Sequence, residues 1–239
     1  MTTVFDLSLL AYEPPGWGKV LLVGFLRSIQ LAAGGYLLGI LIGIAGAAGK
    51  LYGNKVVRDL FEIYTMVIRA VPELVLMLLF YYVGTDLLSR ASTAMGFGSV
   101  DIDGLTAGIL VIGLVQGGYA TEVFRGAILA VPRGQTEAAQ AFGMSPGKVL
   151  RRVTLPAMTP HALPGMANLW MIATKDTALL AVIGFSELTL VTRQAAGATQ
   201  HYIMFFLAAG VLYLALTLVS NLALRRFERY ARRGLVSTR

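Results

Sequence analysis

One stretch of the chain indicates the fold more than any other. It consists of EAAQAFG at residues 137–143, followed after nine residues by VTLP at residues 153–156. The alanine-rich composition of residues 136–142 favours about two helical turns, and the final glycine can take the left-handed conformation that ends a helix. Ser145 then provides a cap, and Pro146 suits the first position of a following helix. The stretch therefore predicts a short helix, a tight turn and a second, basic helix.

The rest of the chain has the composition of a membrane protein. Apolar residues make up 56% of the 239 residues and charged residues only 14%, with a mean hydropathy of +0.69. Soluble domains are roughly 45–50% apolar and about 25% charged. The length allows five or six spans of about 20 residues in a single membrane domain, residues 1–239. The chain has no cysteine, which excludes disulfides, thiolate metal sites and cysteine nucleophiles.

Five apolar segments predict an all-α protein with five transmembrane helices. They lie at residues 19–49, about 60–84, about 105–129, about 162–185 and about 202–224. In the first segment, glycines 35, 39 and 43 follow the small-xxx-small spacing of closely packed membrane helices. We expect that stripe to pack against a neighbouring helix.

The basic residues give the orientation of these spans. Lys and Arg number 14 in segments 49–58, 125–152 and 225–239, against three in segments 1–19, 86–104 and 186–198. Cytoplasmic flanks collect Lys and Arg, so the N-terminus is predicted outside and the C-terminus in the cytoplasm. The net charge of +7 then reflects these flanks and not a nucleic-acid partner.

The polar cluster Lys175, Asp176 and Thr177 is costly inside the fourth apolar segment. An ionisable residue near the centre of a span costs about 2.5–3.5 kcal/mol on insertion scales, and such residues face the bundle interior or a wet cavity. Together they offer an anion and donors to a zwitterionic or cationic substrate. The alternative is a self-compensating Lys–Asp pair that only holds helices together.

A second polar break, Arg69 to Glu73, interrupts the second apolar segment. Pro72 removes a backbone donor, and broken helices near the bilayer midplane are where transporters tend to place their sites. Arg69 and Glu73 are therefore further candidates for substrate binding; a packing kink with Arg69 directed to the cytoplasm is the alternative. Glu122 and Arg125 are three residues apart and are expected to pair locally, near a cytoplasmic gate.

The spacing of the opening stretch resembles the cytoplasmic loop signature of the membrane subunits of ABC importers. In that family the loop holds the coupling helix, which docks on the ATP-hydrolysing subunit. The matching positions are Glu137, Ala138, Ala139, Gly143, Leu155 and Pro156. The resemblance implies the type I importer permease fold, with a coupling loop within residues 133–156. An ordinary alanine-rich connector is the alternative.

Further segments resemble the polar amino-acid branch of these permeases, the histidine, lysine, arginine and opine type. They are residues 69–82, 122–128, 134–139 and 175–179, with Gly184 and Glu187–Leu188. The chain departs from the pattern at Pro160–His161, where relatives usually have an Arg followed by another residue.

The resemblance implies a permease subunit in the bacterial inner membrane that imports polar, in particular basic, amino acids or opines. It also implies a dimer of ATPase subunits, a sister permease or second copy, and a periplasmic binding protein as partners. The chain has no Gly-rich phosphate loop and no paired metal ligands. We therefore expect ATP and magnesium to bind to the ATPase subunit, and we expect this chain to catalyse no reaction. The nearest alternative function is that of a permease for another small polar solute. An energy-independent channel or a membrane-embedded hydrolase is a more distant alternative. The chain has only two His, which argues against most hydrolase sites.

Overall fold

The computed structural model of the chain describes residues 6–96, 98 and 102–231, and the regular structure in these ranges is helical. The helices are η1 (Leu7–Leu10), α1 (Gly18–Tyr52), α2 (Lys55–Ala70), α3 (Glu73–Ala94), α4 (Gly104–Leu129), α5 (Arg133–Ala141), α6 (Pro146–Val149), the π-helical turn η2 (Leu150–Thr154), α7 (Leu155–Asp176), the 3-10 helix η3 (Thr177–Val182), α8 (Leu188–Thr199) and α9 (Tyr202–Ala231). Residues 232–239, which contribute to the charge count of the C-terminal segment, lie outside the described residues. The predicted all-helical class is confirmed.

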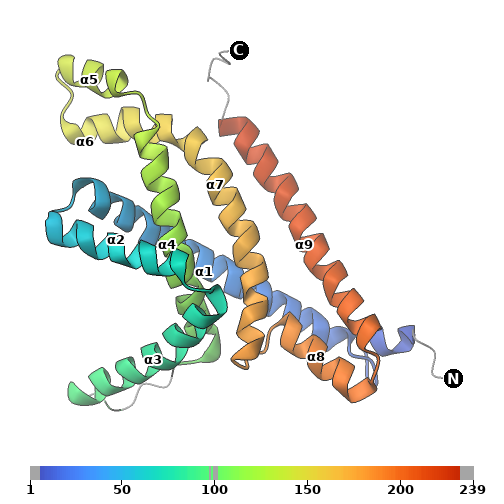
Figure 1. Ribbon diagram of the computed structural model, residues 1–239. Coiled ribbons are helices and arrows are strands. Elements are labelled where there is room, and N and C mark those ends of the chain that lie inside the picture. The colour runs from blue at the N-terminus through green and yellow to red at the C-terminus, as the bar shows by residue number, and fades with distance from the viewer. Residues whose placement is uncertain (1–5, 97, 99–101, 232–239) are drawn as a thin grey trace.

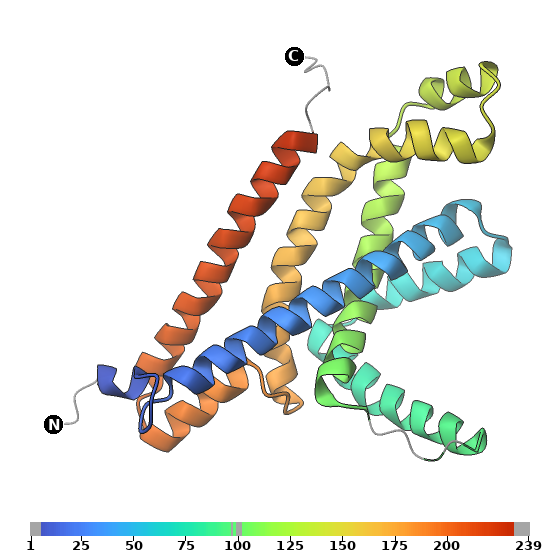
Figure 2. The ribbon, with the colours of Figure 1, turned by 180° about the vertical axis from the view of Figure 1, so that it is seen from behind.

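Helices α1 and α4 form the most extensive pair, and α7 packs against both. Figure 1 shows α4 and α7 running from the α5–α6 hairpin at one end of the molecule towards α8 at the other. In Figure 2, α1 crosses both of them diagonally. The end of α9 lies at the same end of the molecule as the α5–α6 hairpin, and η1 lies at the opposite end.

The glycine stripe of α1 packs against a neighbouring helix, as predicted, and that helix is α4. A Cβ atom on Gly39 would lie 2.8 Å from the Cβ of Gln116, and one on Gly43 would lie 2.5 Å from the Cβ of Ala120. Separations this short are inside van der Waals contact, so the backbones approach as closely as they do only because these positions lack side chains. The stripe thereby holds Gln116 at a fixed distance from α1.

We expect Gly43→Ala to destabilise the protein by about 1–3 kcal/mol, the usual cost of overfilling a packed core. The matched control is Gly210→Ala in α9, where an added Cβ meets nothing within 4 Å. Thermal unfolding in detergent measures both. Equal midpoints for the two variants would contradict the packing described for α1 and α4.

The predicted second span, residues 60–84, is wrong in its boundaries. The helix α2 ends at Ala70, Val71 is extended, and α3 begins again at Glu73. Pro72 has no N–H to continue the helix, and the residue before a proline is disfavoured in the helical region. The long apolar helix is α3, and it runs to Ala94 through the first half of the predicted loop 85–103.

The predicted fourth span, 162–185, also differs. The helix α7 starts earlier and continues through Pro160 and Pro164, because the fixed φ of proline is compatible with a helix that gives up one bond at each position. It ends at Asp176, so the Lys175–Thr177 cluster lies at the end of a helix and not in its middle. The outer segment 186–198, predicted to be a connection, contains α8.

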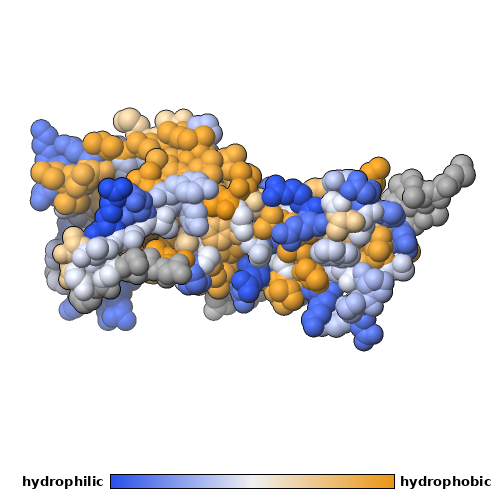
Figure 3. All heavy atoms as spheres, turned by 90° about the horizontal axis from the view of Figure 1, so that it is seen from below, coloured by the Kyte–Doolittle hydropathy of each residue, from blue (hydrophilic) through white to orange (hydrophobic). Residues whose placement is uncertain are grey.

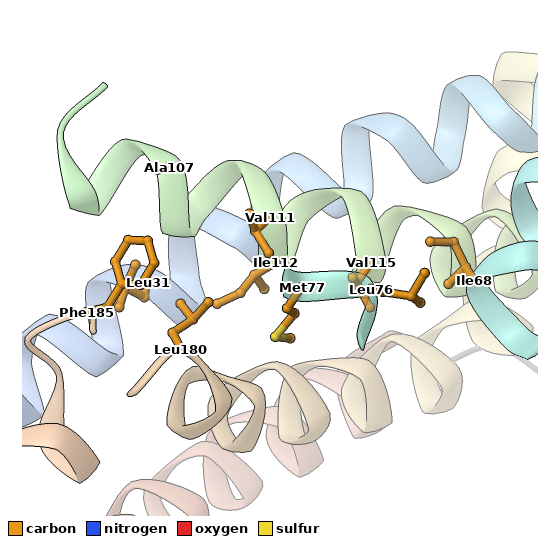
Figure 4. Packing of buried hydrophobic residues seen from close by; sticks show 10 residues of the cluster. All are labelled: Leu31, Ile68, Leu76, Met77, Ala107, Val111, Ile112, Val115, Leu180 and Phe185. Carbon is orange, nitrogen blue, oxygen red and sulfur yellow. The ribbon is translucent and has the colours of Figure 1, made fainter. Parts of the chain in front are cut away.

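Four helices of the described residues are long and apolar enough to cross a membrane, namely α1, α3, α4 and α9. The largest apolar cluster lines the face of α4 that meets α1, α2, α3 and the end of η3. Figure 4 shows its side chains in a row along α4, with Leu31 and Phe185 near one end and Ile68 near the other. Apolar side chains therefore fill the contact with these elements over residues 107–115 of α4.

Candidate functional site

Asp176, at the last position of α7, is the centre of a buried polar site. Only 5% of the residue is exposed, and its carboxylate accepts a hydrogen bond of 2.9 Å from the side-chain nitrogen of Gln116 on α4. Gln116 is itself 1% exposed, and its Oε1 has no hydrogen-bond partner within the described residues. A buried acceptor without a donor costs free energy. The position is therefore suited to a ligand that brings a donor.

Glu73 and Tyr119 complete the site. The break at Pro72 places Glu73 in the first turn of α3, where its carboxylate accepts a 3.2 Å hydrogen bond from the hydroxyl of Tyr119 on α4. The carboxylates of Glu73 and Asp176 lie close enough to interact electrostatically. The predicted helix break at Pro72 therefore brings the carboxylate of Glu73, on α3, close to the carboxylate of Asp176 at the end of α7.

This group of side chains is rich in acceptors and in negative charge. Two close carboxylates repel each other when both are ionised, and either a proton on one of them or a cation beside them relieves this repulsion. A guanidinium or ammonium group supplies that charge together with several N–H donors, one of which can satisfy the free oxygen of Gln116. Within the described ranges, no three His, Cys, Asp or Glu side chains gather closely enough to hold a metal ion. The group as a whole offers acceptors and negative charge to whatever occupies it.

The structure does not bring the three consecutive residues of the predicted cluster together. Lys175 is exposed, and the ion pairs of the described residues do not include one between Lys175 and Asp176. Thr177 is buried, but its hydroxyl donates to the backbone oxygen of Thr174 at 3.0 Å. Neighbouring residues in a helix point about 100° apart, which is why consecutive side chains cannot share one site.

Arg69, another predicted site residue, is exposed and lines a different pocket, of about 400 Å³, at the α1–α2–α4 contact. Lys50 also lines that pocket, and its side chain is 3% exposed. Its Nζ lies 2.5 Å from Glu122 and 3.2 Å from Glu62, and donates to Thr65 at 2.9 Å. The predicted pairing of Glu122 with Arg125 is confirmed at 3.0 Å. Sequence reasoning missed Lys50 as a buried residue, since it follows an apolar run like any flanking lysine.

We expect Lys50→Met to destabilise the protein by up to about 3 kcal/mol, because it leaves the mostly buried carboxylate of Glu122 with Arg125 as its remaining partner. The double variant Lys50→Met/Glu122→Leu should recover most of that loss, since it removes both charges. Thermal unfolding in detergent measures the two. A double variant less stable than Lys50→Met alone would contradict a paired, buried lysine.

The hairpin of α5 and α6 has the predicted form. Gly143 has a φ of +76°, a left-handed conformation that favours glycine, and the chain reverses there. Pro146 occupies the first turn of the next helix as expected, whereas the predicted capping by the Ser145 side chain does not occur. From Pro146 the helical path continues through η2 into α7, so the hairpin is joined to α7 without a flexible connection.

The residues that match the importer loop signature differ in their exposure to solvent. Glu137, Ala138, Gly143, Leu155 and Pro156 are exposed, and Ala139 is buried. Phe142 is 88% exposed, the most exposed of the large apolar side chains in the described residues. Sequence reasoning did not single it out, although an aromatic residue inside an otherwise polar loop is a usable signal for a protein contact.

The long apolar helices, with charged and polar side chains buried between them, are those of a multi-pass helical membrane protein. The family model described as "Binding-protein-dependent transport system inner membrane component" matches residues 35–233, and the chain belongs to this family. It is 44% identical over 214 residues to the histidine/lysine/arginine/ornithine transport system permease protein HisQ of Escherichia coli (strain K12), covering 90% of this chain and 94% of that protein. It is 40% identical over 234 residues to the nopaline transport system permease protein NocQ of Agrobacterium fabrum, covering 97% and 99%.

A solved structure has the same fold. A chain in the crystal structure of an amino acid ABC transporter with histidines gives a TM-score of 0.79 at 28% identity, covering 96% of this chain and all of that chain. The protein is thus the multi-pass inner-membrane permease component of an ABC transporter, and ATP is bound by an ATPase partner. Such a component works with ATPase and substrate-binding-protein partners.

Proposed function

We propose that this permease carries basic amino acids or their opine derivatives into the cytoplasm, and that Glu73 and Asp176 bind the cationic part of the substrate. The observation that carries the proposal is the pair of carboxylates, one buried and one half-buried, beside an unpaired amide oxygen. The names of the similar permeases support it, since they refer to histidine, lysine, arginine and ornithine in one case and to nopaline in another.

The proposed topology has five spans, α1, α3, α4, α7 and α9, in one transmembrane domain over residues 1–239. The N-terminus is periplasmic and the C-terminus cytoplasmic. The excess of Lys and Arg on one set of segments supports this orientation, as does the position of the α5–α6 hairpin at the same end as the end of α9. In this proposal α2 is not a span but an amphipathic helix beside the inner end of α1, with Lys50 fixing it to α4.

The proposed coupling follows from chain connectivity. The helix α4 carries Gln116 and leads through Pro132 into α5, and α7 leads from η2 to Asp176. At 1.5 Å per residue, Gln116 lies about 20 Å and Asp176 about 30 Å from the hairpin ends of their helices. In our proposal the loop within residues 133–156 docks on the ATPase, so that movement of the ATPase dimer changes the separation of the two residues that form the site.

The proposed assembly contains a second permease chain, either a sister permease or another copy of this one, beside the ATPase dimer and a periplasmic binding protein. The wide apolar surface of α9 supports a position against lipid or another permease, since nine large apolar side chains are exposed among the described side chains of this helix. This chain itself contributes the substrate site and the coupling loop.

Uptake into proteoliposomes that contain the complete transporter tests the substrate class. We expect ATP-dependent uptake of labelled arginine that unlabelled lysine, histidine or an opine suppresses, whereas glutamate and methionine at the same concentration leave it unchanged. Suppression by glutamate or methionine to the same degree as by lysine would contradict a site that selects for positive charge.

A further inference from the structure

A cavity of about 330 Å³ lies at the end of the molecule opposite the coupling hairpin, and it is separate from the buried site at Asp176. Its walls come from α1, α3, the start of α4 and the loop between η3 and α8; the polar side chains among them include Arg27 and Asp103. Figure 3 views the molecule from this side, where hydrophilic residues lie beside a broad apolar area. The volume is within the range of about 300–1,000 Å³ typical of small-molecule sites.

The two charges of this outer cavity are opposite and separate. Asp103 caps α4 and accepts hydrogen bonds from the backbone N–H and the hydroxyl of Thr106, at 3.1 and 2.6 Å. These bonds hold the pKa of the Asp103 carboxyl below its usual value, so it is ionised at neutral pH. Arg27 is exposed, and the ion pairs among the described residues do not include one between Arg27 and Asp103. The cavity therefore has a cationic and an anionic wall.

The remaining wall is aromatic and apolar. Tyr81 and Phe185 meet edge to face, with ring centroids 5.3 Å apart, and Leu31 and Ile183 lie beside them. Such a surface accommodates the aliphatic part of a side chain, while its rings favour a nearby cation. A cavity that combines opposite charges with apolar lining suits a zwitterion that carries an aliphatic chain.

An apolar partition separates this cavity from the buried site at Asp176. Leu31 and Phe185 line the cavity and also belong to the row of side chains along α4 in Figure 4, which continues through Leu180 and Ile112. Moving a charged group through such packing without a partner costs several kcal/mol or more. A substrate that reaches the cavity therefore stops there until the helices separate.

We propose that the outer cavity is a waiting site for a free α-amino acid, whose carboxylate binds Arg27 and whose ammonium binds Asp103. The choice of an amino acid rests on the proposed function. The site would hold substrate released at the outer face before it passes to Glu73 and Asp176. A phosphatidylethanolamine headgroup has the same pairing of an ammonium with an anion, so lipid composition is an arm of the test.

Equilibrium binding of labelled arginine to the purified transporter, in nanodiscs without phosphatidylethanolamine, tests the proposal. We expect two arginines per copy of this chain. Arg27→Gln and Asp103→Asn should each lower the count to one, and the second exchange keeps the cap of α4 because asparagine is as good an N-cap as aspartate. The variant Asp176→Asn should remove the other arginine. The control Arg90→Gln alters an exposed, paired arginine of α3 outside the cavity and should leave both.

The outcomes separate the two proposals. One arginine per chain that is lost in Asp176→Asn and kept in Arg27→Gln would overturn the waiting site and leave the proposed function intact. No arginine bound by the wild type, with tight binding of an acidic or neutral amino acid, would overturn both. If phosphatidylethanolamine displaced the Arg27-dependent arginine at an equimolar ratio, the cavity would be a lipid site and the proposal would also fail.

Discussion

Asp176→Asn is expected to weaken arginine binding at the buried site by about 100-fold and to reduce uptake in proportion at low substrate concentration. The exchange keeps the size of the side chain and removes the charge, so Gln116 keeps a partner while the substrate cation loses one. Removing one member of a buried charge pair costs about 2–5 kcal/mol, and about 3 kcal/mol corresponds to 100-fold. Uptake and binding are measured on the complete transporter in proteoliposomes.

Two matched variants distinguish loss of the site from loss of the fold. Lys175→Gln changes the adjacent, exposed residue and should leave arginine affinity within about twofold, the difference expected of a charge screened by solvent. Glu187→Gln changes another buried carboxylate, which accepts bonds from Ser28, Leu190 and Tyr213. It should lower stability without changing affinity. Equal affinity loss in Asp176→Asn and Glu187→Gln would contradict a specific site.

Glu137→Arg is expected to reduce ATP-driven uptake by at least about tenfold while arginine binding stays unchanged. Glu137 is exposed in the middle of α5, far along the chain from the buried site, so reversing its charge can act on a docked partner but not on the substrate. A loss of about 1.4 kcal/mol in docking corresponds to tenfold. Uptake, ATP hydrolysis and arginine binding are measured on the same preparation.

The control for this variant is Gln135→Arg, which adds a positive charge at an exposed position of the same helix outside the motif. It should keep most of the uptake. If Glu137→Arg transported as well as the wild type, or if both variants lost uptake equally, the coupling role of Glu137 would be wrong.

The sequence predicted the hairpin well because its determinants are local. Gly143 needs only its own backbone freedom to take a φ of +76°, and the fixed φ of Pro146 suits the first turn of a helix. The glycine stripe of α1 was likewise visible as a spacing, although its partner on α4 was not. Composition was sufficient for the membrane class, since soluble domains are less apolar and more highly charged.

The site was only partly predictable, because its residues come from three helices that are distant in sequence. Asp176 and Glu73 could be identified from the sequence, because a charged residue inside a membrane span costs free energy. Gln116 and Tyr119 did not, since an amide or a phenol in an apolar run is common and its partner depends on how the helices pack. The sequence also suggested Lys175 and Thr177, which are adjacent to Asp176 in the chain but point elsewhere.

The most direct test of the account is a structure of the complete transporter in nanodiscs with arginine bound. We predict that the guanidinium or the ammonium lies between the carboxylates of Glu73 and Asp176 and donates to Oε1 of Gln116. Arginine bound inside the membrane without contact to Glu73 or Asp176, with Gln116 Oε1 still unpaired, would contradict the proposed site and with it the charge selection on which the proposed function depends.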